Sequence, residues 1–171
     1  MNISGGQFKG RKILTPDERI TRPTLSKVRM SIFNCLFSIL GDFESMSFLD
    51  VFGGSGIMGL EALSRGFSKV TVIEQNKKAF QVIKKNYEAL NLKPDLILGN
   101  ALGVIPKLSL KYNVAYVDPP YAAGIYEETL ELLKNKAEII ILEHPSTLKF
   151  EIEGIIKEKE YGDKTITYIR A

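Results

Sequence analysis

The pattern of hydrophobic and polar positions changes near residue 48. Before that point, apolar residues spaced three and four apart predict one amphipathic helix, which Thr24 would cap and Gly41 would end. The predicted apolar face of this helix consists of Leu25, Val28, Ile32, Cys35, Leu36 and Ile39. Beyond residue 48, short apolar runs alternate with amphipathic stretches, which is the pattern of strands alternating with helices.

The apolar runs predict a sheet with helices on both faces. They are continuous rather than alternating, which is typical of the parallel core of an α/β protein. The predicted strands span residues 48–52, 69–74, 95–99, 113–118 and 138–144. The predicted helices between them span residues 57–66, 75–92, 102–108 and 126–136.

Both ends of the chain depart from this alternation. Residues 155–170 read as two strands around Gly162 and Asp163, which predicts a C-terminal antiparallel hairpin. Residues 3–15 carry glycines and alternating apolar positions, and they predict a hairpin or an extended arm. We therefore expect an α/β domain extended by a hairpin and a helix at its N-terminus and by a hairpin at its C-terminus.

Composition favours one soluble domain over residues 1–171, with 44% hydrophobic and 25% charged residues. No stretch is apolar enough to span a bilayer, and the first residues lack the apolar region of a secretory signal. The only cysteine, Cys35, cannot form an internal disulfide, so we expect a reducing, cytoplasmic compartment. We also expect a monomer. One cysteine and one histidine, His144, are too few for a zinc site.

The net charge of +3 is unevenly distributed. Residues 1–30 hold seven basic and two acidic residues, a net charge of +5, whereas the remaining 141 residues carry −2. Residues 1–23 therefore form a basic N-terminal arm within the domain. Such an arm is typical either of a surface that binds a polyanion or of an ordinary solvated terminus, and charge alone does not separate the two.

A glycine-rich loop follows the first strand of the predicted core. Gly54, Gly56 and Gly59 match G-x-G-x-x-G between a strand and a helix, and Glu74 closes the next strand about 20 residues later, where an acid would accept ribose hydroxyls. This arrangement suits NAD or S-adenosylmethionine. Asp50 favours the latter, because its carboxylate would repel a pyrophosphate but attract a sulfonium and an ammonium group.

The fourth strand ends in Asp118-Pro119-Pro120-Tyr121. The prolines fix the backbone and remove N–H donors, so a carboxylate and carbonyls remain to accept hydrogen bonds. Tyr121 offers a ring on which a planar base would stack. The motif predicts a site that receives the N–H groups of an exocyclic amine, at the sheet edge where α/β proteins bind ligands.

These two motifs together resemble those of amino-group methyltransferases that have a Rossmann-like fold and use S-adenosylmethionine. The segments GGQFKGRKI, TRPTLSKVRMSIFN, LDVFGGSGIMGLEALSRG, VIEQN and YVDPPY also follow the order and spacing of the RsmD-type methyltransferases. The resemblance covers nearly the whole chain and weakens after His144. It implies a Rossmann-like methyltransferase fold and methylation of the exocyclic N2 amine of a guanine in small-subunit (16S) ribosomal RNA.

The resemblance also implies roles for residues that match its motifs. The implied catalytic residues are Asp118, Pro119, Pro120 and Tyr121. The implied cofactor-binding residues are Asp50, Gly53, Gly54, Gly56, Glu74, Gln75, Asn100 and Ala101. Asn100 stands where many methyltransferases have aspartate, and its amide oxygen would accept a bond from the adenine amine. The residues expected to contact RNA phosphates are Lys9, Arg11, Lys12, Arg22 and Arg29.

Several alternatives remain open on the residues alone. An adenine-N6 DNA methyltransferase shares the D-P-P-Y motif, but the chain shows no obvious target-recognition domain. A glutamine-N5 protein methyltransferase would favour asparagine at position 118. An NAD-binding oxidoreductase would use the same glycines, but no hydride-transfer partner is evident. A noncatalytic RNA-binding protein would have no need of the D-P-P-Y motif. Metal is not required for the predicted methyl transfer.

Overall fold

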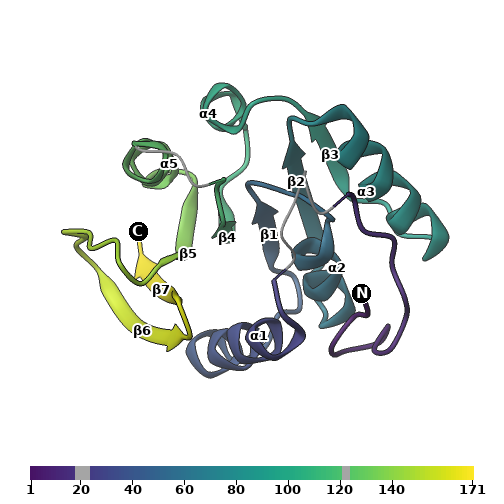
Figure 1. Ribbon diagram of the computed structural model, residues 1–171, viewed down its shortest axis with the longest axis horizontal. Helices are drawn as coiled ribbons and strands as arrows, with labels where there is room; N and C mark the ends of the chain where they lie inside the picture. The colour runs from purple at the N-terminus through teal and green to yellow at the C-terminus, as the bar shows by residue number, and fades with distance from the viewer. Residues whose placement is uncertain (18–23, 121–123) are drawn as a thin grey trace.

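The computed structural model describes residues 1–17, 24–120 and 124–171 (Figure 1). In these ranges the strands form one seven-stranded sheet with the order β3-β2-β1-β4-β5-β7-β6. The strands are β1 Ser47–Asp50, β2 Lys69–Glu74, β3 Asp95–Leu98, β4 Tyr112–Val117, β5 Ala137–Pro145, β6 Ile155–Tyr161 and β7 Lys164–Arg170. Strands β1 to β5 pair in parallel, and β7 and β6 add antiparallel pairs at one edge. The predicted parallel core and the C-terminal hairpin around Gly162 and Asp163 are confirmed.

Helices cover both faces of the sheet (Figure 1). They are α1 Ser26–Leu40, α2 Ile57–Ser64, α3 Lys77–Ala89, α4 Ala101–Val104 with the 3-10 turn η1 Ile105–Lys107, and α5 Ile125–Leu133. Apolar residues of α1, α2 and α3 share one core cluster with Phe48, Val72 and Tyr116 of the sheet. Those of α4, η1 and α5 share a second cluster with residues of the opposite face. The two clusters are the reason that the central strands are apolar without alternation.

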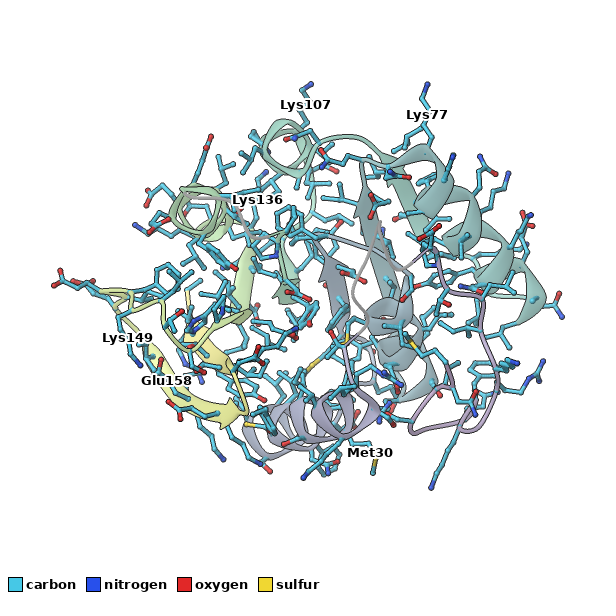
Figure 2. The ribbon with its side chains drawn as sticks, viewed as in Figure 1. Met30, Lys77, Lys107, Lys136, Lys149 and Glu158 are labelled. Atoms are coloured by element: carbon cyan, nitrogen blue, oxygen red, sulfur yellow. The ribbon has the colours of Figure 1, made fainter. Side chains whose placement is uncertain are left out.

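The start of α1 differs from the sequence prediction. Leu25, not Thr24, occupies the N-cap position, and no side chain there accepts a bond from the helix. Leu25 is 72% exposed, so it does not belong to the apolar face of α1. The buried face includes Val28 and Arg29, and Met30 points away from the sheet (Figure 2). Gly41 ends the helix with a positive φ, as predicted.

The N-terminal segment packs against the domain instead of extending from it. A single antiparallel bridge joins Asn2 and Lys12, and turns connect them, so the predicted hairpin is reduced to one pair. Ile3 and Ile13 are buried in the core cluster of α1 to α3. The part of the predicted basic arm at residues 18–23 lies outside the described residues.

The neighbouring strands β1 and β4 mark the point where the strand order reverses. From β1 the chain continues to β2 and β3 on one side, and from β4 to β5 on the other. The crevice outside the carboxyl ends of such a strand pair is where open α/β sheets bind ligands. Asp50 ends β1 and Asp118 follows β4, so the topology brings both predicted acids to this crevice.

Candidate active site at the carboxyl edge of the sheet

Four acids end neighbouring strands on the same face of the sheet. Asp50 lies opposite Val72 of β2 and Tyr116 of β4. Side chains alternate along a strand, so Glu74 and Asp118, each two residues further on, face the same side. Tyr116 lies opposite Ile141 of β5, and the fourth acid, Glu143, follows by the same rule. All four face the layer of α1, α2 and α3.

Asp50 is the least satisfied of these acids. Its side chain is 1% exposed, and neither carboxylate oxygen accepts a hydrogen bond from the described residues. Burial raises the pKa of Asp50 well above its usual value; the nearby Gly59 amide opposes this, and the charges of Glu74 and Asp118 add to it. A buried carboxylate without donors is costly in the folded state. It therefore suits a ligand that carries cationic N–H groups or a sulfonium.

The glycines that follow Asp50 are needed for reasons that differ from one position to the next. Gly54 and Gly56 have positive φ angles of 57° and 77°, which L-residues adopt only with strain. Gly53 and Gly59 instead leave room for neighbours: a Cβ on Gly59 would stand 2.9 Å from Val70 Cγ1. The loop thus lies close against β2 and α3.

Glu74 fixes this loop and keeps acceptor capacity. Its Oε2 accepts a bond from the Gly54 amide at 2.8 Å, and its Oε1 accepts one from the Asn76 amide at 2.7 Å. An ionised carboxylate has about four lone-pair sites, so two or more remain for ribose hydroxyls. The role predicted for Glu74 from the sequence is compatible with this geometry.

Asn100 and Gln75 meet where β2 and β3 end. Asn100 Nδ2 donates to Gln75 Oε1 at 3.1 Å, and Asn100 Oδ1 accepts from the Leu102 amide at 3.0 Å as the cap of α4. Ala101 begins α4 and is buried, whereas Asn100 and Gln75 are exposed. The predicted adenine-side residues are thus brought together beside Glu74, with one lone pair of the Asn100 oxygen still available.

Asp118 stands at the opposite side of the crevice from Glu74. It is partly buried, and burial, reinforced by the charge of Glu143 and opposed by that of Lys164, raises its pKa to about 8. Pro119 is buried and Pro120 is exposed, in the extended turn that follows β4. Tyr121, the fourth residue of the predicted catalytic motif, lies outside the described residues.

Glu143 is a buried acid whose contacts the sequence did not reveal. It is 0% exposed, and it forms an ion pair with Lys164 of β7. The Tyr116 hydroxyl donates to its Oε2 at 2.5 Å, and the Thr24 hydroxyl donates to the same oxygen at 3.4 Å. The sequence analysis placed Glu143 only within the predicted strand 138–144, because its partners come from distant parts of the chain.

The residues predicted to bind RNA divide into two groups. Lys9, Arg11 and Lys12 are exposed on the N-terminal loop, which packs on the C-terminal end of α2 through hydrogen bonds to Ser64. Since α2 has eight residues and rises from the carboxyl edge, this loop lies about 12 Å away along the helix axis. Arg22 lies outside the described residues.

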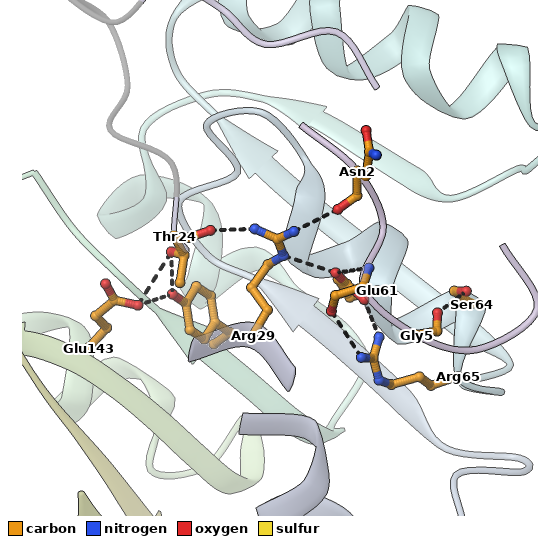
Figure 3. Close-up of polar contacts among 10 residues, drawn as sticks. Asn2, Gly5, Thr24, Arg29, Glu61, Ser64, Arg65 and Glu143 are labelled. Atoms are coloured by element: carbon orange, nitrogen blue, oxygen red, sulfur yellow. Dashed lines mark hydrogen bonds and ion pairs between the residues drawn. The ribbon is translucent and has the colours of Figure 1, made fainter. Parts of the chain in front are cut away.

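The prediction for Arg29 is wrong. Arg29 is 2% exposed, and its guanidinium donates to Glu61 Oε1 at 2.9 Å, to the Asn2 carbonyl at 2.7 Å and to the Thr24 carbonyl (Figure 3). Glu61 is 0% exposed and also pairs with Arg65. A guanidinium that is enclosed and fully paired in this way does not reach an RNA phosphate. It holds the N-terminal segment and the start of α1 on α2.

The single histidine and the single cysteine both lie among side chains that support the fold. His144 is buried, and its ring nitrogens contact Thr167 Oγ1 and the Pro145 carbonyl, both at 3.0 Å. Cys35 is partly buried against the core cluster of α1 to α3. Within residues 1–17, 24–120 and 124–171, no group of three or more potential ligand side chains is arranged to hold a metal ion. No helix in these ranges is long and apolar enough to cross a membrane.

Comparisons with known proteins agree with this geometry. The family model described as "Conserved hypothetical protein 95" matches residues 1–170. The "Ribosomal RNA small subunit methyltransferase D" of Escherichia coli K12 is 38% identical over 136 residues, which are 79% of this chain and 67% of that protein. The solved structure of yhhF, a candidate methyltransferase of Escherichia coli, matches with a TM-score of 0.84 and 30% identity, over 99% of this chain and 97% of that one.

A more distant structure contains ligands. The Thermus thermophilus 16S rRNA N2 G1207 methyltransferase, solved with AdoMet and guanosine, matches with a TM-score of 0.72 and 14% identity. The match covers 88% of this chain and 44% of that one. At this identity the likeness concerns the fold alone.

Proposed function

The chain belongs to the conserved hypothetical protein 95 family, and we propose that it methylates the exocyclic N2 amine of a guanine in 16S ribosomal RNA, with S-adenosylmethionine as the methyl donor. The relative from Escherichia coli K12 is named as a methyltransferase of small-subunit ribosomal RNA. The observation that carries the proposal is the pair of acids at the strand-order reversal, Asp50 and Asp118. One suits the cationic donor and the other suits the amine that receives the methyl group.

The residues of the crevice fit the donor. Asp50 offers two buried acceptor oxygens without partners among the described residues, which matches the ammonium and sulfonium groups of S-adenosylmethionine. Glu74 would accept the ribose hydroxyls, and Asn100 with Gln75 would border the adenine. NAD fits less well, because its pyrophosphate would approach Gly54 and Gly56 close to the carboxylate of Asp50. Gly53 would allow the loop to lie close to the donor, and Ala101 would border the adenine beside Asn100.

Asp118 and the carbonyl of Pro119 would accept the two N–H groups of the substrate amine. The lone pair of a guanine amine is delocalised into the ring, so fixing both N–H groups directs the lone pair toward the methyl group and along the line of transfer. When bound, S-adenosylmethionine supplies a methyl group on a cationic sulfur. The new C–N bond forms as the C–S bond breaks, and Asp118 takes up the proton that the amine then loses.

The ionisation of Asp118 suits this role. A pKa of about 8 leaves Asp118 mostly protonated at neutral pH before ligands bind. A cation in the crevice favours the ionised form of a neighbouring carboxyl group. Asp118 therefore becomes a better acceptor when the cationic donor is in place. Tyr121 is proposed to stack on the base, and Pro120 to hold the turn between them.

The exposed basic residues would contact the RNA backbone. Lys9, Arg11 and Lys12 lie away from the carboxyl edge, so they would bind phosphates of the RNA that flanks the target base, and Arg22 would add a further contact. Such contacts position the substrate without reading its sequence, and they weaken with salt. We further propose that the enzyme acts as a monomer in the cytoplasm, on ribosomal RNA that is free or within an assembling small subunit.

Labelled methyl transfer tests the proposal. The full chain is incubated with S-adenosylmethionine labelled in its methyl group and with naked 16S rRNA or small-subunit particles. We expect label in the RNA with the wild type, none with Asp118→Ala, and full incorporation with Asp163→Ala, a matched change in the exposed β6–β7 turn. If the wild type labels neither naked 16S rRNA nor the small-subunit particles, or if Asp118→Ala keeps full activity, the proposal is contradicted.

Calorimetry separates the donor from its rival. We expect S-adenosylmethionine to bind the wild type and Asp118→Ala alike, and to bind Asp50→Ala at least tenfold more weakly, because Asp50 loses its contacts to cationic groups. NAD should show no binding. Binding of NAD without S-adenosylmethionine would instead support an oxidoreductase.

A further inference from the structure

Glu143 and Lys164 lie directly behind Asp118. Strands β4 and β5 run in parallel with Val117 opposite Leu142, so the next residues, Asp118 and Glu143, stand level at the strand ends. Strand β7 pairs antiparallel with β5 and brings Lys164 opposite Pro145. Lys164 Nζ donates to Glu143 Oε1, and the ion pair therefore closes the crevice on the side away from Asp50.

Both carboxylate oxygens of Glu143 have partners within the domain. Oε1 accepts from Lys164, and Oε2 accepts from the Tyr116 hydroxyl. The Thr24 hydroxyl also donates to Oε2, as Figure 3 shows. With 0% exposure and both oxygens engaged, Glu143 presents no surface to a substrate. Its influence has to pass through its neighbours.

The neighbour exposed to this charge is Asp118. The Glu143 carboxylate raises the pKa of Asp118, and the Lys164 ammonium lowers it. Within residues 1–17, 24–120 and 124–171, the other charged or titratable groups that interact with Asp118 are Asp50 from β1 and Tyr116 from β4 itself. Tyr116 is neutral and already donates to Glu143, and Asp50 lies on the cofactor side. Among the described residues, Glu143 and Lys164 are therefore the charges that can set the ionisation of Asp118 independently of the cofactor site.

We propose that Glu143 and Lys164 form a positioning pair that sets the ionisation of Asp118 through opposed charges, and so fixes the pH range in which Asp118 accepts a substrate amine. The part that concerns methyl transfer rests on the proposed function. The part that concerns Asp118 itself does not, since two charges at fixed positions act on a third whether or not a substrate is present.

The experiment measures Asp118 directly in the protein without cofactor. The carboxyl carbons of aspartate are labelled with 13C, the Asp118 resonance is assigned by its loss in Asp118→Asn, and its pKa is followed by NMR titration. Glu143→Gln should lower the measured pKa of Asp118 by about 1, and Lys164→Met should raise it by a similar amount. Glu160→Gln is the matched control, because this exposed residue of β6 loses the same charge far from Asp118, and it should leave the pKa unchanged.

Opposite shifts of the Asp118 pKa in the two variants support the proposal. They also exclude a purely structural role, in which the ion pair only joins β5 to β7. Loss of a purely structural ion pair would destabilise the fold without moving the pKa of Asp118 in opposite directions. Shifts of the same sign, or no shift, overturn the proposal. If Glu143→Gln does not fold, Lys164→Met decides, because an unchanged or lowered pKa in that variant is sufficient for rejection.

Kinetics connects the pair to catalysis. The acid limb of the pH profile of kcat/KM should move down in Glu143→Gln and up in Lys164→Met. If NMR shows the opposed shifts but no RNA is methylated, the proposed function fails and the charge coupling stands. If methyl transfer occurs and the NMR titrations of the variants match the wild type, the proposed function stands and the role of the pair is wrong.

Discussion

Arg29→Met tests whether the buried Arg29 supports the fold or binds RNA. The substitution keeps the aliphatic stem and removes a guanidinium that bonds Glu61 and the carbonyls of Thr24 and Asn2. Removing one partner of a buried ion pair costs about 3–5 kcal/mol. Arg65 still pairs with Glu61, so we expect the lower end, about 3 kcal/mol. For a chain of this length that lowers Tm by about 6–12 °C.

Urea unfolding and salt-dependent RNA binding measure the two effects separately. Lys12→Met is the control, because the side chain of Lys12 is exposed and its antiparallel bridge to Asn2 is made through the backbone. It should leave the free energy of unfolding unchanged and reduce the slope of log K against log salt by about 0.7–0.9, the value of one phosphate contact. Arg29→Met should show the reverse, a lower stability with an unchanged slope. An unchanged stability together with a reduced slope in Arg29→Met would refute the structural role.

Three further predictions follow from the crevice and its loop. Gly59→Ala should lower the free energy of unfolding by about 1–2 kcal/mol in urea, because its Cβ would overlap Tyr87 Oη and Val70. This overlap outweighs the gain in helix propensity, and a stabilised variant would contradict the prediction. Glu74→Gln should weaken S-adenosylmethionine about tenfold by calorimetry, since the ribose loses a charged acceptor; unchanged binding would contradict it. The free energy of unfolding of the wild type should fall as pH rises from about 4 to about 8, because the folded state keeps Asp118 protonated while the unfolded chain releases the proton. In Asp118→Asn this fall should be smaller, and an equal slope would contradict the raised pKa.

The strand ends could be predicted because each depends only on neighbouring residues, an apolar run followed by an acid. Asp50, Glu74 and Asp118 each follow an apolar run, and the carboxyl ends of parallel strands meet at one edge. The glycine spacing located the loop between them. Asn100 and Gln75 were implied by the resemblance to the methyltransferases, and the fold brings their side chains into a hydrogen bond.

The contacts around Glu143 and Arg29 could not be predicted in the same way. Glu143 meets Lys164 only after β7 pairs with β5, and it meets Thr24 across 119 positions of sequence. Arg29 is polar, and periodicity alone assigns a charged residue to the solvent. Glu61 on α2 reverses that assignment, because a buried carboxylate requires a cation, and only the packing of α1 on α2 identifies it.

Thr24 illustrates how one residue serves several elements. Its position before an amphipathic stretch predicted a helix cap, yet Leu25 occupies that position. The Thr24 hydroxyl instead bonds Tyr116 and Glu143, while its carbonyl accepts from Arg29 (Figure 3). Thr24 thus links the packing of the N-terminal segment to Glu143, which lies behind Asp118.

The identity of the methylated nucleoside tests the central claim most directly. RNA from 16S rRNA or small-subunit particles is treated with the enzyme and S-adenosylmethionine, digested to nucleosides and analysed by mass spectrometry against synthetic standards. We predict N2-methylguanosine in the wild-type reaction and its absence with Asp118→Ala. A methylated nucleoside other than N2-methylguanosine, such as N6-methyladenosine, or no methylated nucleoside in any substrate, would contradict the account.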